Sequence, residues 1–276
     1  MKLIQFLQSV LADTFLLASP KASRQTPSYA MVSPTLALVT LLTIATVLTT
    51  VSCTTPTSPG RMVPDGEIPT PQDIYRDAAA AKKVMNNVAP EGAITIFGSA
   101  RSKPGNPYYD STREFARLRS EQHGERFPIL TGGSGGAMEA GNRGAHDAGA
   151  PSLYIATYFK GGHEESVNEY VTDGYLASSF AQREADLVDY AAGIIVAPGG
   201  VGTSWEIFES LSKIQTRKKA PCAIVLLGDR AVWQPLFDYM AHLSSIGTIS
   251  PEDVHLLQLA ETPEAAVALL EEGLSL

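Results

Sequence analysis

The fold is decided by the stretch Pro198-Gly199-Gly200-Val201-Gly202-Thr203, which Glu206 follows three residues later. A short apolar run, 193–197, precedes it, and the amphipathic segment 205–211 follows it. This order predicts a strand, a glycine turn and the N-terminus of a helix. Glycines let the backbone approach a ligand closely, and the free N–H groups of a first helical turn favour an anion. The stretch therefore predicts a phosphate site with an acidic side chain beside it.

The same pattern of strand, turn and helix recurs on both sides of this stretch. Upstream, we expect strands at 93–97, 127–130 and 153–156 and helices at 108–123, 137–148 and 178–191. Downstream, we expect a strand at 223–228 and helices near 231–243, 251–258 and 263–272. Short apolar strands that alternate with helices indicate a parallel sheet covered on both faces. The prediction is an α/β fold, a Rossmann-like doubly wound parallel sheet in a single domain.

Three glycine-bearing turns fall at the predicted strand ends, where ligands bind in such folds. They contain Gly98, then Gly132 to Gly136, and then Gly199 to Gly202. The first turn, Gly98-Ser99-Ala100-Arg101, does not match the dinucleotide pattern G-x-G-x-x-G, and the chain contains no Gly-Lys-Ser/Thr of a P-loop. These turns therefore favour a monophosphate. The candidate phosphate- and substrate-binding residues are Gly98, Ser99, Arg101, Gly132, Gly133, Gly136, Met138, Gly199, Gly200, Gly202 and Thr203.

The first seventy residues differ in composition from the rest of the chain. Residues 35–51 are apolar, and no charged residue lies between Arg24 and Arg61. We expect residues 1–53 to be a signal-like or membrane-anchor segment, 54–71 a proline-rich linker, and 72–276 the catalytic domain. Residues 50–53 resemble a bacterial lipoprotein cleavage site, with Cys53 as the lipid-bearing residue. The alternative is translation from Met62, which would leave the protein cytoplasmic.

Charge and cysteine content exclude several function classes. The formal net charge is −8, and no basic stripe is present, so we expect no nucleic-acid partner. The two cysteines, Cys53 and Cys222, form neither a disulfide framework nor a metal cluster. We expect no metal and no cofactor. The membrane would be contacted through the N-terminal segment only.

The motifs Thr131-Gly132-Gly133-x-x-Gly136-x-Met138-Glu139-Ala140 and Pro198-Gly199-Gly200-x-Gly202-Thr203-x-x-Glu206, with Arg183 between them, resemble those of the Lonely Guy (LOG) family. Its members are cytokinin riboside 5′-monophosphate phosphoribohydrolases, long mislabelled as lysine decarboxylases, and this chain is similar to their longer bacterial branch. The resemblance implies hydrolysis of the N-glycosidic bond of an AMP-like or N6-modified adenine nucleotide. It also implies a homodimer with the active site near the subunit interface, and Arg183 and Glu206 as the catalytic pair.

The assigned roles agree with the chemistry of the two side chains. A carboxylate at Glu206 would stabilise an oxocarbenium-like ribose and orient water, and Arg183 would hold ribose or phosphate oxygens. The family often has Arg-Lys where this chain has Arg183-Glu184, and Trp205 stands where an acidic residue is common. A non-catalytic nucleotide- or molybdenum-cofactor-binding protein is the alternative. Lysine decarboxylation would need pyridoxal phosphate on a suitably placed lysine, and the nearest ones, Lys160 and Lys213, are not in such a pattern.

Overall fold

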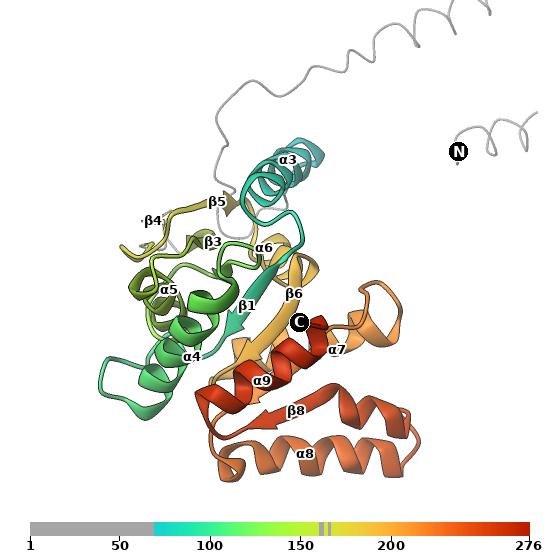
Figure 1. Ribbon diagram of the computed structural model, residues 1–276. Helices are drawn as coiled ribbons and strands as arrows, with labels where there is room; N and C mark the ends of the chain where they lie inside the picture. Colours follow the sequence, from blue (N-terminus) through green and yellow to red (C-terminus); the bar gives the residue numbers. More distant parts are fainter. Residues whose placement is uncertain (1–68, 160–162, 165–166) are drawn as a thin grey trace, which may run out of the picture. The chain divides into compact units, whose positions relative to one another are not determined.

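The computed structural model describes residues 69–159, 163–164 and 167–276. They form a sheet whose seven parallel strands lie in the order β5-β3-β2-β1-β6-β7-β8 (Figure 1). A further strand of two residues, β4, pairs antiparallel with the end of β3. The strands are β1 (Ala93–Phe97), β2 (Ile129–Thr131), β3 (Ser152–Phe159), β4 (His163–Glu164), β5 (Asp173–Ala177), β6 (Ala191–Val196), β7 (Ile224–Leu227) and β8 (Leu257–Ala260).

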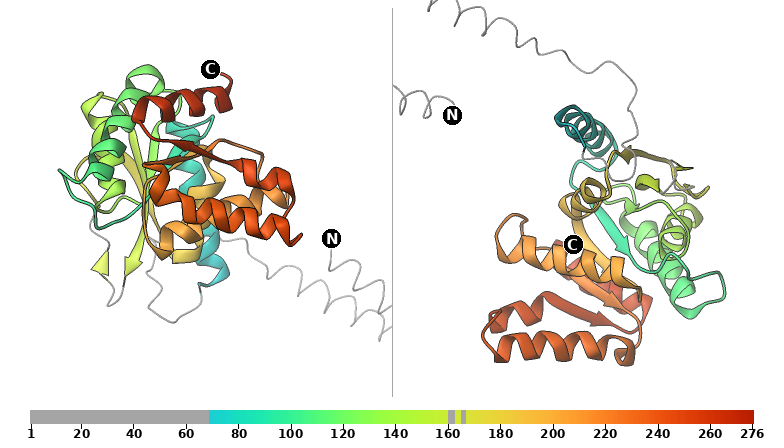
Figure 2. Two further views of the ribbon diagram at one scale, coloured as in Figure 1. Left: turned by 90° about the horizontal axis from the view of Figure 1, so that it is seen from below. Right: turned by 180° about the vertical axis from the view of Figure 1, so that it is seen from behind.

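Helices cover both faces of this sheet, as the views of Figures 1 and 2 show. One face packs against α3 (Pro71–Val88), α6 (Phe180–Asp189), α7 (Val201–Gln215) and α8 (Arg230–Ser245). The other packs against α4 (Pro107–His123), α5 (Ala137–Asp147) and α9 (Pro263–Leu274). Strands buried on both faces read as continuous apolar runs, and all five residues of β1 are buried. The predicted Rossmann-like, doubly wound α/β fold is confirmed.

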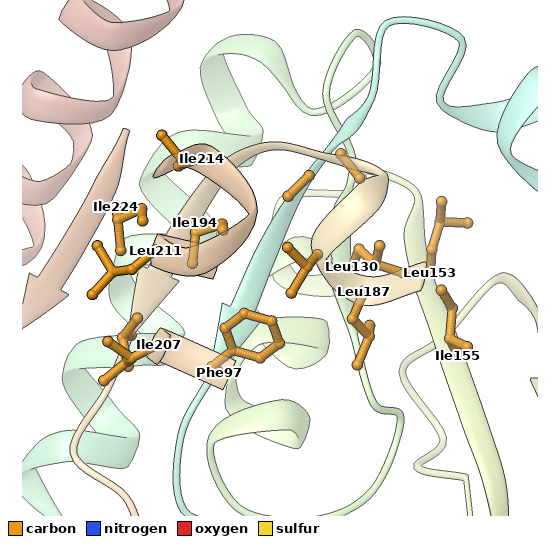
Figure 3. Close-up of a cluster of buried hydrophobic side chains, with 14 of the residues drawn as sticks. Phe97, Leu130, Leu153, Ile155, Leu187, Ile194, Ile207, Leu211, Ile214 and Ile224 are labelled. Carbon is orange, nitrogen blue, oxygen red and sulfur yellow. The ribbon is translucent and has the colours of Figure 1, made fainter. Parts of the chain in front are cut away.

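A buried apolar cluster packs helices α6 and α7 against the sheet. Leu187 of α6 and Ile207, Leu211 and Ile214 of α7 pack in one buried cluster with strand residues such as Ile194 (Figure 3). Burial of each such side chain contributes about 1.5–3 kcal/mol. The apolar stripe of α7 therefore fixes the helix whose first turn carries the glycine motif.

The parallel strands β1 and β6 lie side by side, and the order in which the chain adds strands to the sheet changes direction between them. From β1 the chain proceeds outward through β2, β3 and β5, then returns to β6 and continues outward through β7 and β8 on the other side. A ligand site in an open parallel sheet lies at such a switch point, beyond the carboxyl ends of the strands. The loops after β1 and β6, which begin at Gly98 and Ala197, meet at this place, where the Ser99 N–H donates to the Pro198 carbonyl at 3.2 Å.

Three details differ from the predictions. The helix expected at 251–258 is a 3₁₀ segment, η1 (Pro251–Leu256), followed by strand β8, whose Leu257 and Ala260 are buried at the end of the sheet. Strand β5 was not predicted. Helix α3 begins at Pro71, inside the predicted linker, because Thr70 and Asp73 form a capping box there.

The predicted anchor, the lipidation candidate Cys53 and the linker up to residue 68 lie outside the described residues. Within the described ranges, no helix is both long enough and apolar enough to cross a bilayer.

Candidate active site

A pocket of about 520 Å³ lies at the switch point between β1 and β6. Its volume falls within the range of sites that bind small molecules. It brings together ten of the residues predicted from the sequence, namely Gly98, Ser99, Arg101, Gly132, Met138, Arg183, Gly200, Gly202, Thr203 and Glu206. Glu184, Phe180 and Val201 also form part of its wall.

The N-terminus of α7 forms the end of the pocket suited to an anion. Gly200 is the N-cap residue and makes no side-chain cap hydrogen bond, so the first-turn amides are not occupied by a capping side chain. A methyl group added to Gly200 or Gly202 would meet no described atom within 4 Å, which leaves the backbone open to a ligand. The exposed Arg101 lies on the same wall and adds a positive charge. A phosphate group fits these features.

Gly133, Gly136 and Gly199 were predicted to bind phosphate, but the described wall of the pocket does not include them. Gly136 has φ of 71°, and a Cβ there would collide with the Ser99 carbonyl oxygen. A Cβ at Gly199 would collide with the Thr203 hydroxyl. These glycines allow the loops to pack against each other and so support the pocket from behind.

A polar network that the sequence analysis did not identify fixes the loop that contains Gly132. The Asn168 backbone N–H donates to the Gly133 carbonyl at 2.7 Å, and the Asn168 side-chain amide donates to the Gly133 carbonyl at 2.9 Å. That amide also donates to Oδ1 of the buried Asn142 at 2.9 Å, and Asn142 accepts from the Thr131 hydroxyl at 2.7 Å. Thr131 and Gly133 belong to the first glycine motif, but no local pattern in the sequence pointed to their contacts with Asn142 and Asn168.

Arg183 is buried, with only 4% of its surface exposed, and its contacts hold it in one orientation. Its Nε donates to the Ile155 carbonyl at 3.1 Å, and its Nη1 forms an ion pair with the carboxylate of Glu184. Its Nη2 lies 3.6 Å from the Met138 sulfur. Met138 therefore packs against the guanidinium group while still forming part of the pocket wall. A planar donor fixed in this way is suited to hold substrate oxygens.

The second predicted catalytic residue, Glu206, lies beside Glu184 in an environment that favours its protonated form. Burial and the negative charge of Glu184 together raise the pKa of Glu206 to about 9, against the opposing effect of Arg183. Burial also raises the pKa of Glu184, while the charge of Arg183 lowers it. Burial and the neighbouring Glu184 thus both favour the protonated form of Glu206 in the folded protein. Two carboxyl groups with different environments are typical of acid–base sites.

The described wall of the pocket contains no lysine. The Nζ of Lys213 lies 2.8 Å from Asp189 and 3.1 Å from Glu209, so its ammonium group is engaged in ion pairs. Lys160 lies outside the described residues. Nor do the described residues contain a group of three His, Cys, Asp or Glu side chains that could hold a metal ion. The described part of the pocket wall thus contains no amine for a Schiff base.

The chain is similar in sequence to several known proteins. A family model described as "Possible lysine decarboxylase" matches residues 138–270. A cytokinin riboside 5′-monophosphate phosphoribohydrolase from Rhodococcoides fascians is 26% identical over 181 residues, which cover 64% of this chain and 88% of that protein. A protein from Oryza sativa subsp. japonica named "Probable cytokinin riboside 5′-monophosphate phosphoribohydrolase" is 28% identical over 144 residues, 52% of this chain and 58% of that protein.

A solved structure has the same fold. It is the molybdenum cofactor binding protein from the phototrophic bacterium Rippkaea orientalis, with a TM-score of 0.50 and 21% sequence identity. The alignment covers 66% of this chain and 96% of the Rippkaea orientalis chain. At this identity the likeness concerns the fold alone. The family model, by contrast, includes Met138, Arg183 and the motif from Pro198 to Glu206, and together with the two sequence relatives it supports the resemblance to the Lonely Guy (LOG) family.

Proposed function

We propose that this protein hydrolyses the N-glycosidic bond of a nucleoside 5′-monophosphate and releases a free base and ribose 5-phosphate. One observation carries the proposal: Arg183, Glu184 and Glu206 line the same pocket as the N-terminus of α7, which is suited to bind a phosphate group. The names of the two sequence relatives support this reaction. The base would be adenine or an N6-modified adenine.

In the proposed complex, the 5′-phosphate lies at the first turn of α7. The backbone amides near Gly200 and Gly202 and the guanidinium of Arg101 would bind it, because a helix N-terminus and a nearby cation both favour a dianion. The ribose would then lie beside Arg183 and Glu206, deeper in the pocket. Arg183 would donate to ribose oxygens, and the carboxyl groups would act where positive charge develops on the sugar ring.

We further propose a homodimer that forms through an aromatic surface beside the pocket, made by Phe180, Trp205, Phe208 and Tyr239. Their exposed fractions range from 37% to 51%, and they pair as Phe180 with Trp205 and Phe208 with Tyr239 at centroid distances of 5.4 and 6.2 Å. Exposed aromatic clusters are typical of protein–protein interfaces. A partner on this surface would lie close to the mouth of the pocket.

We also propose that residues 35–53 attach the protein to a membrane, with a lipid on Cys53. Cytoplasmic location after a start at Met62 is its alternative. Metabolic labelling with a radioactive fatty acid distinguishes the two. We expect label on the wild-type chain and none on Cys53→Ser, whereas an unlabelled wild-type chain would contradict the lipid anchor.

The test of the activity is chromatography of AMP and N6-isopentenyl-AMP after incubation with the full chain. We expect free base from the wild type and a loss of about 10²-fold or more in Glu206→Gln and Arg183→Ala. Glu209→Gln is the matched control, because Glu209 lies on the same helix but pairs with Lys213 instead of forming part of the pocket wall. Nucleotide binding without base release would favour the non-catalytic carrier, a function in keeping with the name of the Rippkaea orientalis protein of the same fold.

A further inference from the structure

Glu184 is a buried acid in the pocket wall that the resemblance leaves without a role. It follows Arg183 on α6, and only 1% of its surface is exposed. One carboxylate oxygen, Oε1, accepts from Arg183. The other, Oε2, is buried and accepts no hydrogen bond from an amide, hydroxyl or amine of the described residues. A buried carboxylate oxygen without a donor costs about 1–3 kcal/mol, so a partner for Oε2 must be sought in the pocket.

Glu206 lies in the same pocket wall as Glu184, and the two carboxyl groups are close enough to affect each other's ionisation. Since Arg183 occupies Oε1, Oε2 is the atom available to Glu206. Two ionised carboxylates are acceptors only, so a hydrogen bond between them requires a proton on one of them. The same rule holds for other close carboxyl pairs, in which two like charges at contact distance do not both ionise.

The charges around the pair fix where this proton resides. Arg183 donates to Glu184 and so stabilises the ionised form of that residue. Glu206 lies on α7 with Glu209 nearby, and the Nζ of Lys213 lies 3.1 Å from Glu209. One cation thus faces two carboxyl groups, and the favoured state has Glu184 ionised and Glu206 protonated. The net charge of the three groups is then zero, which suits a site with little exposed surface.

We propose that Glu184 is a second acid–base residue, and that it and Glu206 share one proton which serves both halves of the hydrolysis. This inference rests on the proposed function. In the first half, the bond between C1′ and the base nitrogen breaks, its electron pair goes to the nitrogen, and Glu206 donates its proton to the departing base. In the second half, water forms the new C1′–O bond and gives up one proton to the ionised pair. The products are ribose 5-phosphate and the neutral free base, whose nitrogen now carries the proton from Glu206. The proton from water restores the single proton of the carboxyl pair.

The simpler role for Glu184 would be to orient Arg183 alone. An ion pair between neighbouring residues can do so, but it uses only Oε1 and leaves the second oxygen buried and unexplained. A shared proton satisfies Oε2, and it also accounts for the presence of two carboxyl groups and one guanidinium in the same wall. The two roles differ in a measurable way, because only the shared proton makes the protonation of Glu206 depend on Glu184.

Infrared difference spectroscopy of the full chain tests this dependence without reference to activity. We expect the carbonyl band of a protonated carboxyl group at neutral pH in the wild type. Glu184→Gln should lose the band at a lower pH than the wild type, because the charge of Glu184 no longer raises the pKa of Glu206, and Glu206→Gln should lack the band at neutral pH. Glu209→Gln should retain it. A wild type without the band, or Glu184→Gln with the same pH dependence of the band as the wild type, would overturn the shared proton.

Kinetics on AMP then test the catalytic part. We expect Glu184→Gln to lower kcat by about 10²-fold with KM changed by less than about threefold, and to alter the pH profile rather than scale it. Base release by Glu184→Gln at the wild-type rate would overturn the role of Glu184 while leaving the proposed activity standing. If the wild type itself released no base, the proposed activity would be wrong, whatever the infrared band showed.

Discussion

Gly132 lies against the guanidinium group of Arg183. A Cβ built on Gly132 would collide with Nη2 of Arg183 and would lie 2.7 Å from both its Cζ and the Met138 sulfur. The glycine after β2 is therefore required by the position of a side chain on α6, which lies about fifty residues further along the chain. The absence of a side chain at Gly132 therefore determines where the guanidinium group of Arg183 can lie.

We expect Gly132→Ala to displace Arg183 and to reduce kcat/KM for AMP by about 10²-fold, because a misplacement of about 1 Å is enough to cost that much. Gly135→Ala is the matched control. A Cβ at Gly135 would lie 3.7 Å from the Ala100 carbonyl oxygen, which is an ordinary contact, and Gly135 is in the same loop. Equal activity of the two variants would contradict the argument. Circular dichroism checks that both are folded.

Helix α3 is linked to the start of α6 through Asp77. Its carboxylate is buried and accepts from the Ser178 backbone N–H at 2.7 Å and from the Ser178 hydroxyl. We expect Asp77→Ala to lower the free energy of unfolding by about 2–3 kcal/mol, because it leaves these buried donors unsatisfied. Urea denaturation measures the change. Asp238→Ala, on the exposed side of α8, should change it by less than about 0.5 kcal/mol.

Most strands, and the helices that pack on the sheet, could be predicted because burial requires apolar residues in a local pattern. The buried strands β1, β2, β6 and β7 are short apolar runs followed by turns, and most of the helices begin after a glycine or a capping residue. Strand β5 escaped prediction because its sequence, Asp173–Ala177, starts with an exposed Asp and a Gly and joins the sheet only through its partner β3. Similarly, β8 follows a 3₁₀ turn, and its apolar residues read equally well as one side of a helix.

The site was predictable where a motif carries it, and not where it depends on distant contacts. The glycine motifs and Glu206 are local patterns, so their place at strand ends followed from the sequence. The contact between Glu184 and Glu206 joins two helices, and Asn168 reaches the Gly132 loop from a segment after β3. No periodicity encodes such contacts. The protonation of Glu206 likewise depends on burial and on Glu184, which only the folded chain supplies.

Because the pKa of Glu206 is raised in the folded protein, stability should depend on pH with a definite sign. The unfolded chain ionises Glu206 near its ordinary pKa, while the folded chain keeps the proton up to about pH 9. Its favourable contribution is fully present below the unfolded pKa and is lost progressively as pH rises toward 9. We expect Glu206→Gln to be more stable than the wild type by a margin that grows between pH 5 and pH 8. Urea denaturation at both pH values measures the margin, and a constant margin would contradict the raised pKa.

A second stabilising substitution is expected at Arg119 of α4. Its side chain is fully buried, its three guanidinium nitrogens form no hydrogen bond with the described residues, and burial lowers its pKa to about 10. A contact with the Phe127 ring at 5.7 Å and the attraction of Glu271 compensate only in part. We expect Arg119→Met to raise the free energy of unfolding by about 1 kcal/mol, because an apolar chain of similar length avoids the desolvation of the charge.

Thermal denaturation compares Arg119→Met with Arg126→Met. Arg126 is exposed and forms a bidentate ion pair with Glu91. Its replacement should therefore lower the free energy of unfolding by less than about 1 kcal/mol. A lower melting temperature for Arg119→Met than for Arg126→Met would show that the buried guanidinium has a partner that compensates for its burial.

The proposed dimer makes a prediction that separates assembly from catalysis. Phe208 and Tyr239 belong to the aromatic surface but not to the described pocket wall, so Phe208→Glu should weaken association without removing a substrate contact. We expect sedimentation velocity to show a dimer for the wild type and a monomer for Phe208→Glu. Ile74→Glu, which alters an exposed apolar residue on α3, should leave the dimer intact. If the monomeric variant also loses base release while it retains its fold, the partner completes the mouth of the pocket. If it keeps full activity, each subunit carries a complete site.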